Sequence, residues 1–273
     1  MPKRVGNAPE ILPAGDSDSP ASRSACAVGY ARGLRNFDPE CSMQRPFDLV
    51  IFDLDGTLVE TAFEIGDAVN DTLAAIGLPP VAQAQVNRWI GHGTRELLIQ
   101  ALASVRGETL PDVRQWAQLP AVYASFDPFY QRRCGTRSQL YPQVREVLTE
   151  LRDAGLKLAV VTNKEGRYTD TVLAAHALAP LLHHVISGDS LALKKPDPAG
   201  VNACLQAVNV PATRALFVGD SSIDVATARN AGVAVWALPY GYNMGEPIEA
   251  SAPDRVIADF SELRDLIVPA NRA

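Results

Sequence analysis

The residues best suited to chemistry are two aspartates, Asp53 and Asp55, which lie one residue apart in the segment DLDGT. Four apolar residues, Leu49 to Phe52, come directly before them, and a short apolar run closed by a turn signal predicts a buried strand of a parallel sheet. Ligands of open α/β sheets bind at the carboxyl ends of such strands. Two neighbouring carboxylates repel each other, so the pair attracts a cation or holds a proton on one member. Both arrangements suit chemistry on phosphate.

Further polar groups follow the ends of three later predicted strands. A hydroxyl at a strand end is also a common helix cap, and Ser221 with Asp224 has the pattern of a capping box, so each signal is weak alone. A Lys-Pro pair is also common in surface loops. These groups are Thr162 and Asn163 after a strand at 156–161, Lys194 and Lys195 after a strand at 184–187, and Asp220 and Asp224 after a strand at 215–218.

The DxDGT segment and the order of the later groups resemble the haloacid dehalogenase superfamily, and in particular its phosphoglycolate phosphatase family. The resemblance runs from about Phe47 to the C-terminus. It implies that Asp53 is a nucleophile that forms an aspartyl-phosphate and that Asp55 is the general acid and then the base. It also implies an Mg²⁺ ion held by Asp53, the backbone carbonyl of Asp55 and the side chain of Asp220.

The same resemblance assigns the remaining groups. Thr162 and the N–H of Asn163 would bind the phosphoryl oxygens. Lys195 would neutralise the nucleophile and the phosphoryl group, with Lys194 as the competing candidate. We expect Asp224 to lie behind the metal ligands and to serve the start of a helix as well.

The fold implied is α/β: a doubly wound, mostly parallel sheet with an inserted α-helical cap of the C1 type. The first predicted strand ends at Phe52 and the next candidate begins near Lys157, about a hundred residues on, whereas a βα crossover needs only about 30 residues for the whole unit. Apolar periodicity in this interval predicts helices at 62–76, 82–89, 94–105 and 111–133. The predicted domains are a core of 45–61 and 139–273, a cap of 62–138 and a disordered N-terminal extension of 1–44.

Within the predicted cap, Gly91, His92 and Gly93 lie at a predicted helix start, where backbone N–H groups favour anions. Arg95 or Arg88 is a candidate partner for a substrate carboxylate. A plain turn between helices with solvated arginines is an equally good interpretation of this loop. The segment 241–243, of sequence GYN, also resembles the phosphoglycolate phosphatase family.

Composition excludes several classes of protein. The net charge of −6 argues against a general nucleic-acid binder. The four cysteines form no CxxC pair, which favours reduced thiols in a cytoplasmic protein. No apolar run approaches the length that crosses a membrane.

Residues 1–44 are rich in Pro, Gly, Ser and Ala and show no periodicity, which predicts disorder. A transit peptide is the alternative, and Glu10, Asp16 and Asp18 count against it. We hypothesise that Met43 marks the functional start.

The predicted function is therefore Mg²⁺-dependent hydrolysis of a small phosphate monoester, with 2-phosphoglycolate favoured. The alternatives are a β-phosphoglucomutase-like enzyme, a broad sugar-phosphate phosphatase or a non-catalytic binding module. Phosphonate hydrolysis is disfavoured because it needs a cap lysine that forms a Schiff base, and residues 62–141 contain no lysine. The expected partner is a small phosphorylated substrate, with no nucleic acid and no membrane, bound by a monomer or homodimer.

Overall fold

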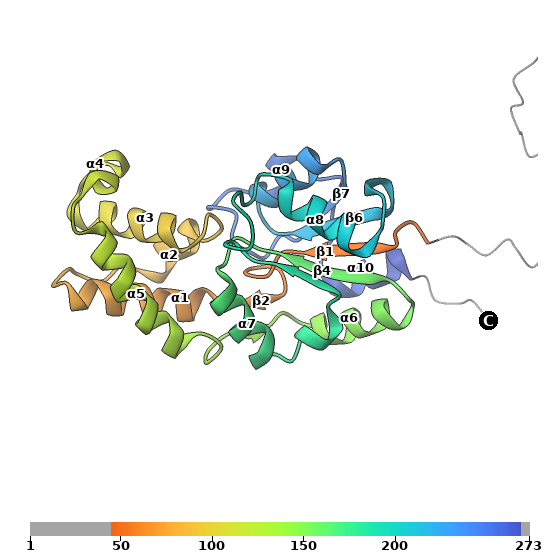
Figure 1. The fold of residues 1–273 in the computed structure, drawn as a ribbon, viewed down its shortest axis with the longest axis horizontal. Coiled ribbons are helices and arrows are strands. Elements are labelled where there is room, and N and C mark those ends of the chain that lie inside the picture. The colour runs from red at the N-terminus through yellow and green to blue at the C-terminus, as the bar shows by residue number, and fades with distance from the viewer. Residues whose placement is uncertain (1–44, 269–273) are drawn as a thin grey trace, which may run out of the picture. The chain divides into compact units, whose positions relative to one another are not determined.

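A six-stranded parallel sheet is the centre of residues 45–268, the part of the chain that the computed structural model describes (Figure 1). The strands pair in the order β5-β4-β1-β6-β7-β8. The chain order reverses beside β1, which pairs with β4 on one side and β6 on the other, and ligands of such sheets bind at this reversal. The strands are β1 (Leu49–Phe52), β4 (Lys157–Val161), β5 (His184–Ile186), β6 (Ala215–Gly219), β7 (Ala234–Ala237) and β8 (Arg255–Val256).

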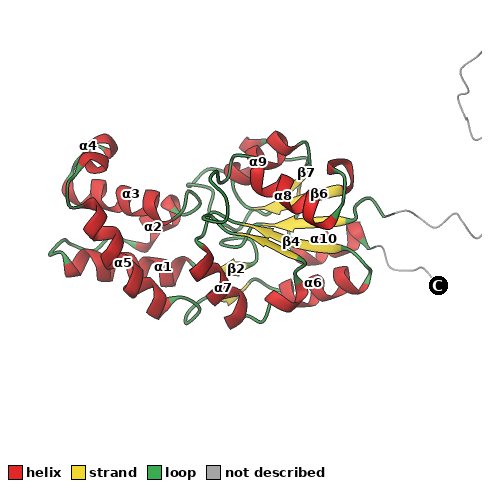
Figure 2. Ribbon diagram, viewed as in Figure 1, coloured by secondary structure: helices red, strands yellow, loops and turns green. Residues whose placement is uncertain are grey.

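Helices cover both faces of this sheet, as Figure 2 shows. Successive side chains of β1 alternate between two apolar clusters, because neighbouring residues of a strand point to opposite faces. Val50 and Phe52 pack in the cluster that includes α6 and α10, where Phe52 stacks on Phe260. Leu49 and Ile51 pack in the cluster that includes α8 and α9. These helices are α6 (Val144–Asp153), α7 (Gly166–Ala175), α8 (Ala199–Val208), α9 (Ser222–Ala231) and α10 (Phe260–Ile267).

Five helices, here called the cap helices, form between β2 and β3 and lie beyond the carboxyl ends of the sheet strands (Figure 1). The short strands β2, where the chain leaves the sheet, and β3, where it returns, pair antiparallel. The sequence did not predict this pairing. The elements of this part are β2 (Val59–Glu60), α1 (Ala62–Ala75), α2 (Gln83–Trp89), α3 (Thr94–Arg106), α4 (Leu110–Gln115), α5 (Leu119–Arg133) and β3 (Gln139–Leu140).

The single helix predicted over 111–133 is wrong, because the structure has two helices, α4 and α5, in this interval. Thr109 forms a capping box with Asp112 at the start of α4. The break between the helices places Pro120 in the first turn of α5, where its missing N–H removes no intrahelical hydrogen bond. The other predicted helices and strands of the described residues agree with the structure to within a few residues.

The predicted α/β fold with a parallel sheet is confirmed. The division into core and cap at residues 61/62 and 138/139 stays a prediction. The expectations for residues 1–44, including the role of Met43, lie outside the described residues. Among the helices described, none is both long enough and apolar enough to cross a membrane.

Candidate active site

Asp53 and Lys195 form a buried ion pair at the carboxyl end of β1. The Nζ atom of Lys195 lies 2.8 Å from Oδ1 of Asp53 and 2.7 Å from Oδ1 of Asp224. Lys194 points elsewhere, since its Nζ donates a hydrogen bond to the carbonyl oxygen of His92 at 2.9 Å. The structure therefore places Lys195, and not Lys194, beside the predicted nucleophile.

Three buried carboxylates meet at the same edge of the sheet. Asp53 follows β1, whereas Asp220 and Asp224 lie at the end of β6 and the start of α9, and one oxygen of each lies within 4.8 Å of the other two. Mg²⁺ prefers oxygen ligands and carboxylates in particular, so this donor set fits a divalent cation. Asp53 and Asp220 are therefore close enough to share one ion, and the metal site itself stays a prediction.

The carboxylate of Asp220 is held by two segments far apart in the sequence. The Thr57 hydroxyl donates to its Oδ1 at 2.5 Å, and the backbone N–H of Tyr242 donates to its Oδ2 at 2.6 Å. At Gly241 a Cβ atom would lie only 2.0 Å from Oδ2 of Asp220, so glycine is needed for this close approach. The segment 241–243 thus positions a candidate metal ligand, a function that the sequence alone did not reveal.

The carboxylate of Asp224 contacts both Lys195 and the start of α9. Its Oδ1 accepts from Lys195, and its Oδ2 accepts from the Ser221 hydroxyl at 2.7 Å and from the backbone N–H of Asp220 and Ser221. The hydrogen bond from the Ser221 N–H is part of the capping box at the start of α9, and Asp220 lies just before the cap residue Ser221. Asp224 therefore fixes the orientation of Lys195 relative to Asp53.

Burial and mutual repulsion shift the pKa values of this group. Burial and, to a smaller extent, the charge of the Asp224 carboxylate raise the pKa of Asp53 to about 7, against the attraction of the Lys195 ammonium. Burial, followed by the charges of Asp224 and Asp53, raises the pKa of Asp220. Burial disfavours the ammonium of Lys195, but Asp224 and Asp53 outweigh it and raise its pKa. A divalent cation would instead lower the carboxyl pKa values, because opposite charge favours ionisation.

Removal of metal should consequently make stability depend on pH. The folded-state pKa of Asp53, about 7, lies above its ordinary value of 3.8, so the folded state holds the proton more tightly. The stability that results is present below the ordinary pKa and is lost as the pH rises through about 7. We expect the melting temperature in a chelator to fall between about pH 5 and pH 8, and added Mg²⁺ to remove most of this fall. Thermal denaturation across this pH range tests the expectation. In the Asp53→Asn variant the melting temperature should depend less steeply on pH. A melting temperature that rises with pH in chelator would contradict the expectation.

Asp55 is held by Lys164, a lysine for which the sequence predicted no role. Lys164 Nζ lies 3.0 and 3.1 Å from the two carboxylate oxygens of Asp55 and donates to the hydroxyl of Tyr130 on α5. The Thr61 hydroxyl donates to the same carboxylate at 2.7 Å. The only signal in the sequence was the position of Lys164 directly after Asn163, and it did not reveal the partners.

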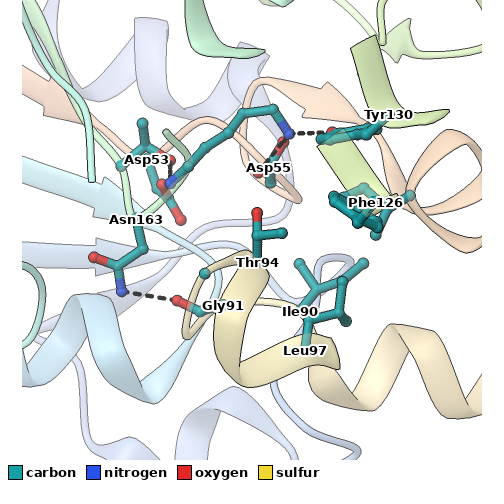
Figure 3. Close-up of a pocket in the computed structure, with 13 residues that line it drawn as sticks. Asp53, Asp55, Ile90, Gly91, Thr94, Leu97, Phe126, Tyr130 and Asn163 are labelled. Atoms are coloured by element: carbon teal, nitrogen blue, oxygen red, sulfur yellow. Dashed lines mark hydrogen bonds and ion pairs between the residues drawn. The ribbon is translucent and has the colours of Figure 1, made fainter. Parts of the chain in front are cut away.

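A cavity with an empty volume of about 470 Å³, part of which is open to solvent, joins these groups to the cap helices (Figure 3). Asp53 and Asp55 line one side of it, and Ile90, Leu97 and Phe126 line the other. The other predicted site residues that line it are Thr162, Asn163, Gly91 and Gly93.

The loop at 91–93 contacts the segments that follow β4 and β5 through the side chains of Asn163 and Lys194. The side-chain amide of Asn163 donates to the carbonyl oxygens of Gly91 at 2.8 Å and of Lys195 at 3.1 Å. His92 and Arg95 do not line the cavity. The guanidinium of Arg95 instead lies 5.3 Å from the ring centroid of Tyr123, so the geometry does not support its predicted contact with substrate.

Comparison with known proteins agrees with this arrangement. The sequence pattern of the haloacid dehalogenase-like hydrolases matches residues 50–238. A phosphoglycolate phosphatase of Vibrio vulnificus (strain CMCP6) is 38% identical over 228 residues, which cover 82% of this chain and 98% of that protein. One from Haemophilus influenzae (strain 86-028NP) is 38% identical over 225 residues, 82% of this chain and 100% of that protein.

A solved structure is also similar. It is described as a predicted phosphoglycolate phosphatase from Haemophilus somnus, is 33% identical, and superposes with a TM-score of 0.75 over 81% of this chain and 97% of that one. The chain belongs to the haloacid dehalogenase-like hydrolase family. The predictions of this family and of a phosphatase that hydrolyses a phosphate monoester are confirmed.

Proposed function

We propose that the protein hydrolyses 2-phosphoglycolate to glycolate and phosphate with the help of Mg²⁺ and through an aspartyl-phosphate on Asp53. The observation that carries the proposal is the meeting of Asp53, Lys195 and a buried group of carboxylates beside a cavity of limited size. The names of the relatives at 38% identity supply the particular substrate. A cytoplasmic location stays a prediction.

The proposed reaction has two steps. A carboxylate oxygen of Asp53 attacks phosphorus, the bond to the ester oxygen breaks, and Asp55 donates a proton to the departing glycolate oxygen. Asp55 then takes a proton from a water molecule, which attacks the phosphorus of the aspartyl-phosphate and releases phosphate and the Asp53 carboxylate. Asp55 lies two residues beyond Asp53, and both line the cavity, so one substrate can meet both.

The charge of the phosphoryl group needs fixed partners during both steps. Lys195 is already directed at Asp53 at 2.8 Å, and the Thr162 hydroxyl lines the same cavity. Asp53, Asp220 and the backbone carbonyl of Asp55 would hold Mg²⁺, with Asp224 behind them. When bound, the ion neutralises charge on the phosphoryl oxygens. Preorganised charges of this kind supply most of the rate enhancement, since proton transfer contributes only about 10²–10⁴-fold.

The cavity wall favours a small substrate over a sugar phosphate. Ile65, Ile90, Leu97 and Phe126, all buried, give the cavity an apolar wall. A sugar hydroxyl placed against this wall would lose its hydrogen bonds to water without replacement, which costs about 1–3 kcal/mol for each group. The wall therefore counts against the β-phosphoglucomutase-like and broad sugar-phosphatase alternatives.

A substrate panel tests the proposal. With Mg²⁺ present we expect kcat/KM for 2-phosphoglycolate to exceed that for glucose 6-phosphate and β-glucose 1-phosphate by about 100-fold or more, because each unpaired hydroxyl weakens binding. Phosphate release is the measurement, and a chelator should abolish it. Equal turnover of the sugar phosphates would reject the substrate, and no release from any monoester, including p-nitrophenyl phosphate, would favour the non-catalytic binding module.

A further inference from the structure

Lys164 is the cationic side chain among the described residues that line the cavity beside Asp53. It follows β4 by three positions, and its side chain is only 3% exposed. Lys195 is already paired with Asp53 and Asp224 on the phosphoryl side, and Arg95 lies outside this cavity. A second anionic group of a bound substrate therefore has one positive partner within reach, Lys164.

The substrate of the proposed function has such a second group. In 2-phosphoglycolate a single methylene lies between the ester oxygen and the carboxylate, so the carboxylate must lie close to the nucleophile. Asp53, Asp55 and Lys164 line one cavity. Asp55 lies two residues after Asp53 and accepts a hydrogen bond from Lys164, so Lys164 lies near the nucleophile. A substrate phosphoryl group on Asp53 thus leaves its carboxylate in the part of the cavity that Lys164 lines.

The ammonium of Lys164 has capacity for a further acceptor. It carries three N–H donors. Its acceptors in the described part of the chain are the two oxygens of Asp55, at 3.0 and 3.1 Å and able to share one N–H, and the hydroxyl of Tyr130. The Asp55 carboxylate also accepts from Thr61, so it keeps a partner if Lys164 turns toward a ligand. One N–H of Lys164 therefore remains for a ligand in the cavity.

Tyr130 holds Lys164 in place from the cap helices. Figure 3 shows Tyr130 beside Asp55 and Phe126 at the cavity. The ring of Tyr130 is buried and packs at 5.4 Å from the centroid of Phe126 and at 4.5 Å from that of Tyr168. Lys164 also lies 4.9 Å from the ring centroid of Tyr130. A side chain restrained in this way is preorganised for binding, because little rotamer freedom is left to lose.

We propose that Lys164, positioned by Tyr130, binds the carboxylate of the substrate and so selects phosphorylated carboxylic acids over neutral phosphate monoesters. The attraction is strong here because the apolar wall lowers the local dielectric constant. Burial disfavours the charge of Lys164, but the Asp55 carboxylate and its other neighbours outweigh this and raise its pKa, so the ammonium is charged at neutral pH. The inference rests on the proposed function and replaces the arginines with Lys164 as the partner of the carboxylate.

The test compares 2-phosphoglycolate with its neutral amide, which has the same shape and lacks the charge. Wild-type protein with Mg²⁺ should show a kcat/KM about 100-fold higher for 2-phosphoglycolate than for the amide, since an unpaired buried charge is costly. In Lys164→Met this ratio should fall to about one. Lys157→Met, which changes an exposed lysine at the other end of β4, should keep the wild-type ratio.

A loss of activity from a disturbed Asp55 would have another signature, because it would lower kcat for both substrates and leave their ratio unchanged. That result would overturn the inference, as would a wild-type enzyme that hydrolyses the amide equally well. If Lys164→Met does not fold, two other measurements decide the question. One is the wild-type ratio of kcat/KM for the two substrates, and the other is Tyr130→Phe, which should change KM for 2-phosphoglycolate alone. Wild-type protein that hydrolyses neither substrate would reject the proposed function itself.

Discussion

Replacing Asp53 with asparagine should reduce phosphate release by about 10⁴-fold or more while the protein stays folded, because the amide oxygen is a poor nucleophile and cannot form the aspartyl-phosphate. The change keeps the size of the side chain. Burial and the neighbouring carboxylate raise the pKa of Asp53 to about 7, which means that its negative charge is unfavourable in the folded protein. Replacing this charge with a neutral amide should therefore cost the fold little stability. Lys195 keeps Asp224 as its ionic partner.

Steady-state phosphate release and the melting temperature are the two measurements. Asp48→Asn is the matched control, since Asp48 lies just before the same strand and pairs with Arg214 at the surface. Its activity should stay near the wild-type value. Acid-quenched wild-type protein should also carry one phosphoryl group that the Asp53→Asn variant lacks. Activity retained in the variant would remove Asp53 as the nucleophile and with it the proposed reaction.

Lys195→Met should affect both stability and catalysis, whereas Lys194→Met should affect neither by more than a few-fold. The side chain of Lys195 is 2% exposed, and its ammonium contacts Asp53 and Asp224. Removing one partner of a buried ion pair leaves uncompensated charge and costs about 3–5 kcal/mol. Loss of a charge directed at the phosphoryl group should lower kcat by at least about 10²–10³-fold.

The neighbouring lysine makes the comparison sharp. Lys194 has the same chemistry and sequence context, but it is exposed and its Nζ donates a hydrogen bond to the backbone carbonyl of His92. Denaturant unfolding measures the free-energy difference, and Mg²⁺ should offset part of the loss in Lys195→Met, because the cation stabilises the same carboxylates. Equal effects of the two substitutions would show that the buried ion pair is not the group that matters.

Much of the site was determined by the sequence itself. Asp53 and Asp220 each follow a short run of buried apolar residues, and such a run specifies a strand whose end lies at the ligand-binding edge. Their convergence follows from parallel pairing, since β1 and β6 are neighbours and run in the same direction. The dual position of Asp224 could likewise be predicted, because a capping box is a local pattern.

Only the tertiary structure decided which lysine serves the site and what surrounds Asp55. Lys194 and Lys195 are adjacent in the sequence, and their different partners depend on how their loop packs against α9 and the loop at 91–93. Lys164, which follows β4, donates a hydrogen bond to Tyr130 on the cap helix α5. The N–H of Tyr242, in the loop after β7, donates to Asp220, in the loop after β6. These contacts join segments far apart in sequence through side-chain orientation and close backbone approach, for which a linear pattern carries no signal. Strand and cap patterns are local, so the sequence reveals them, whereas such contacts are set by packing of the whole fold.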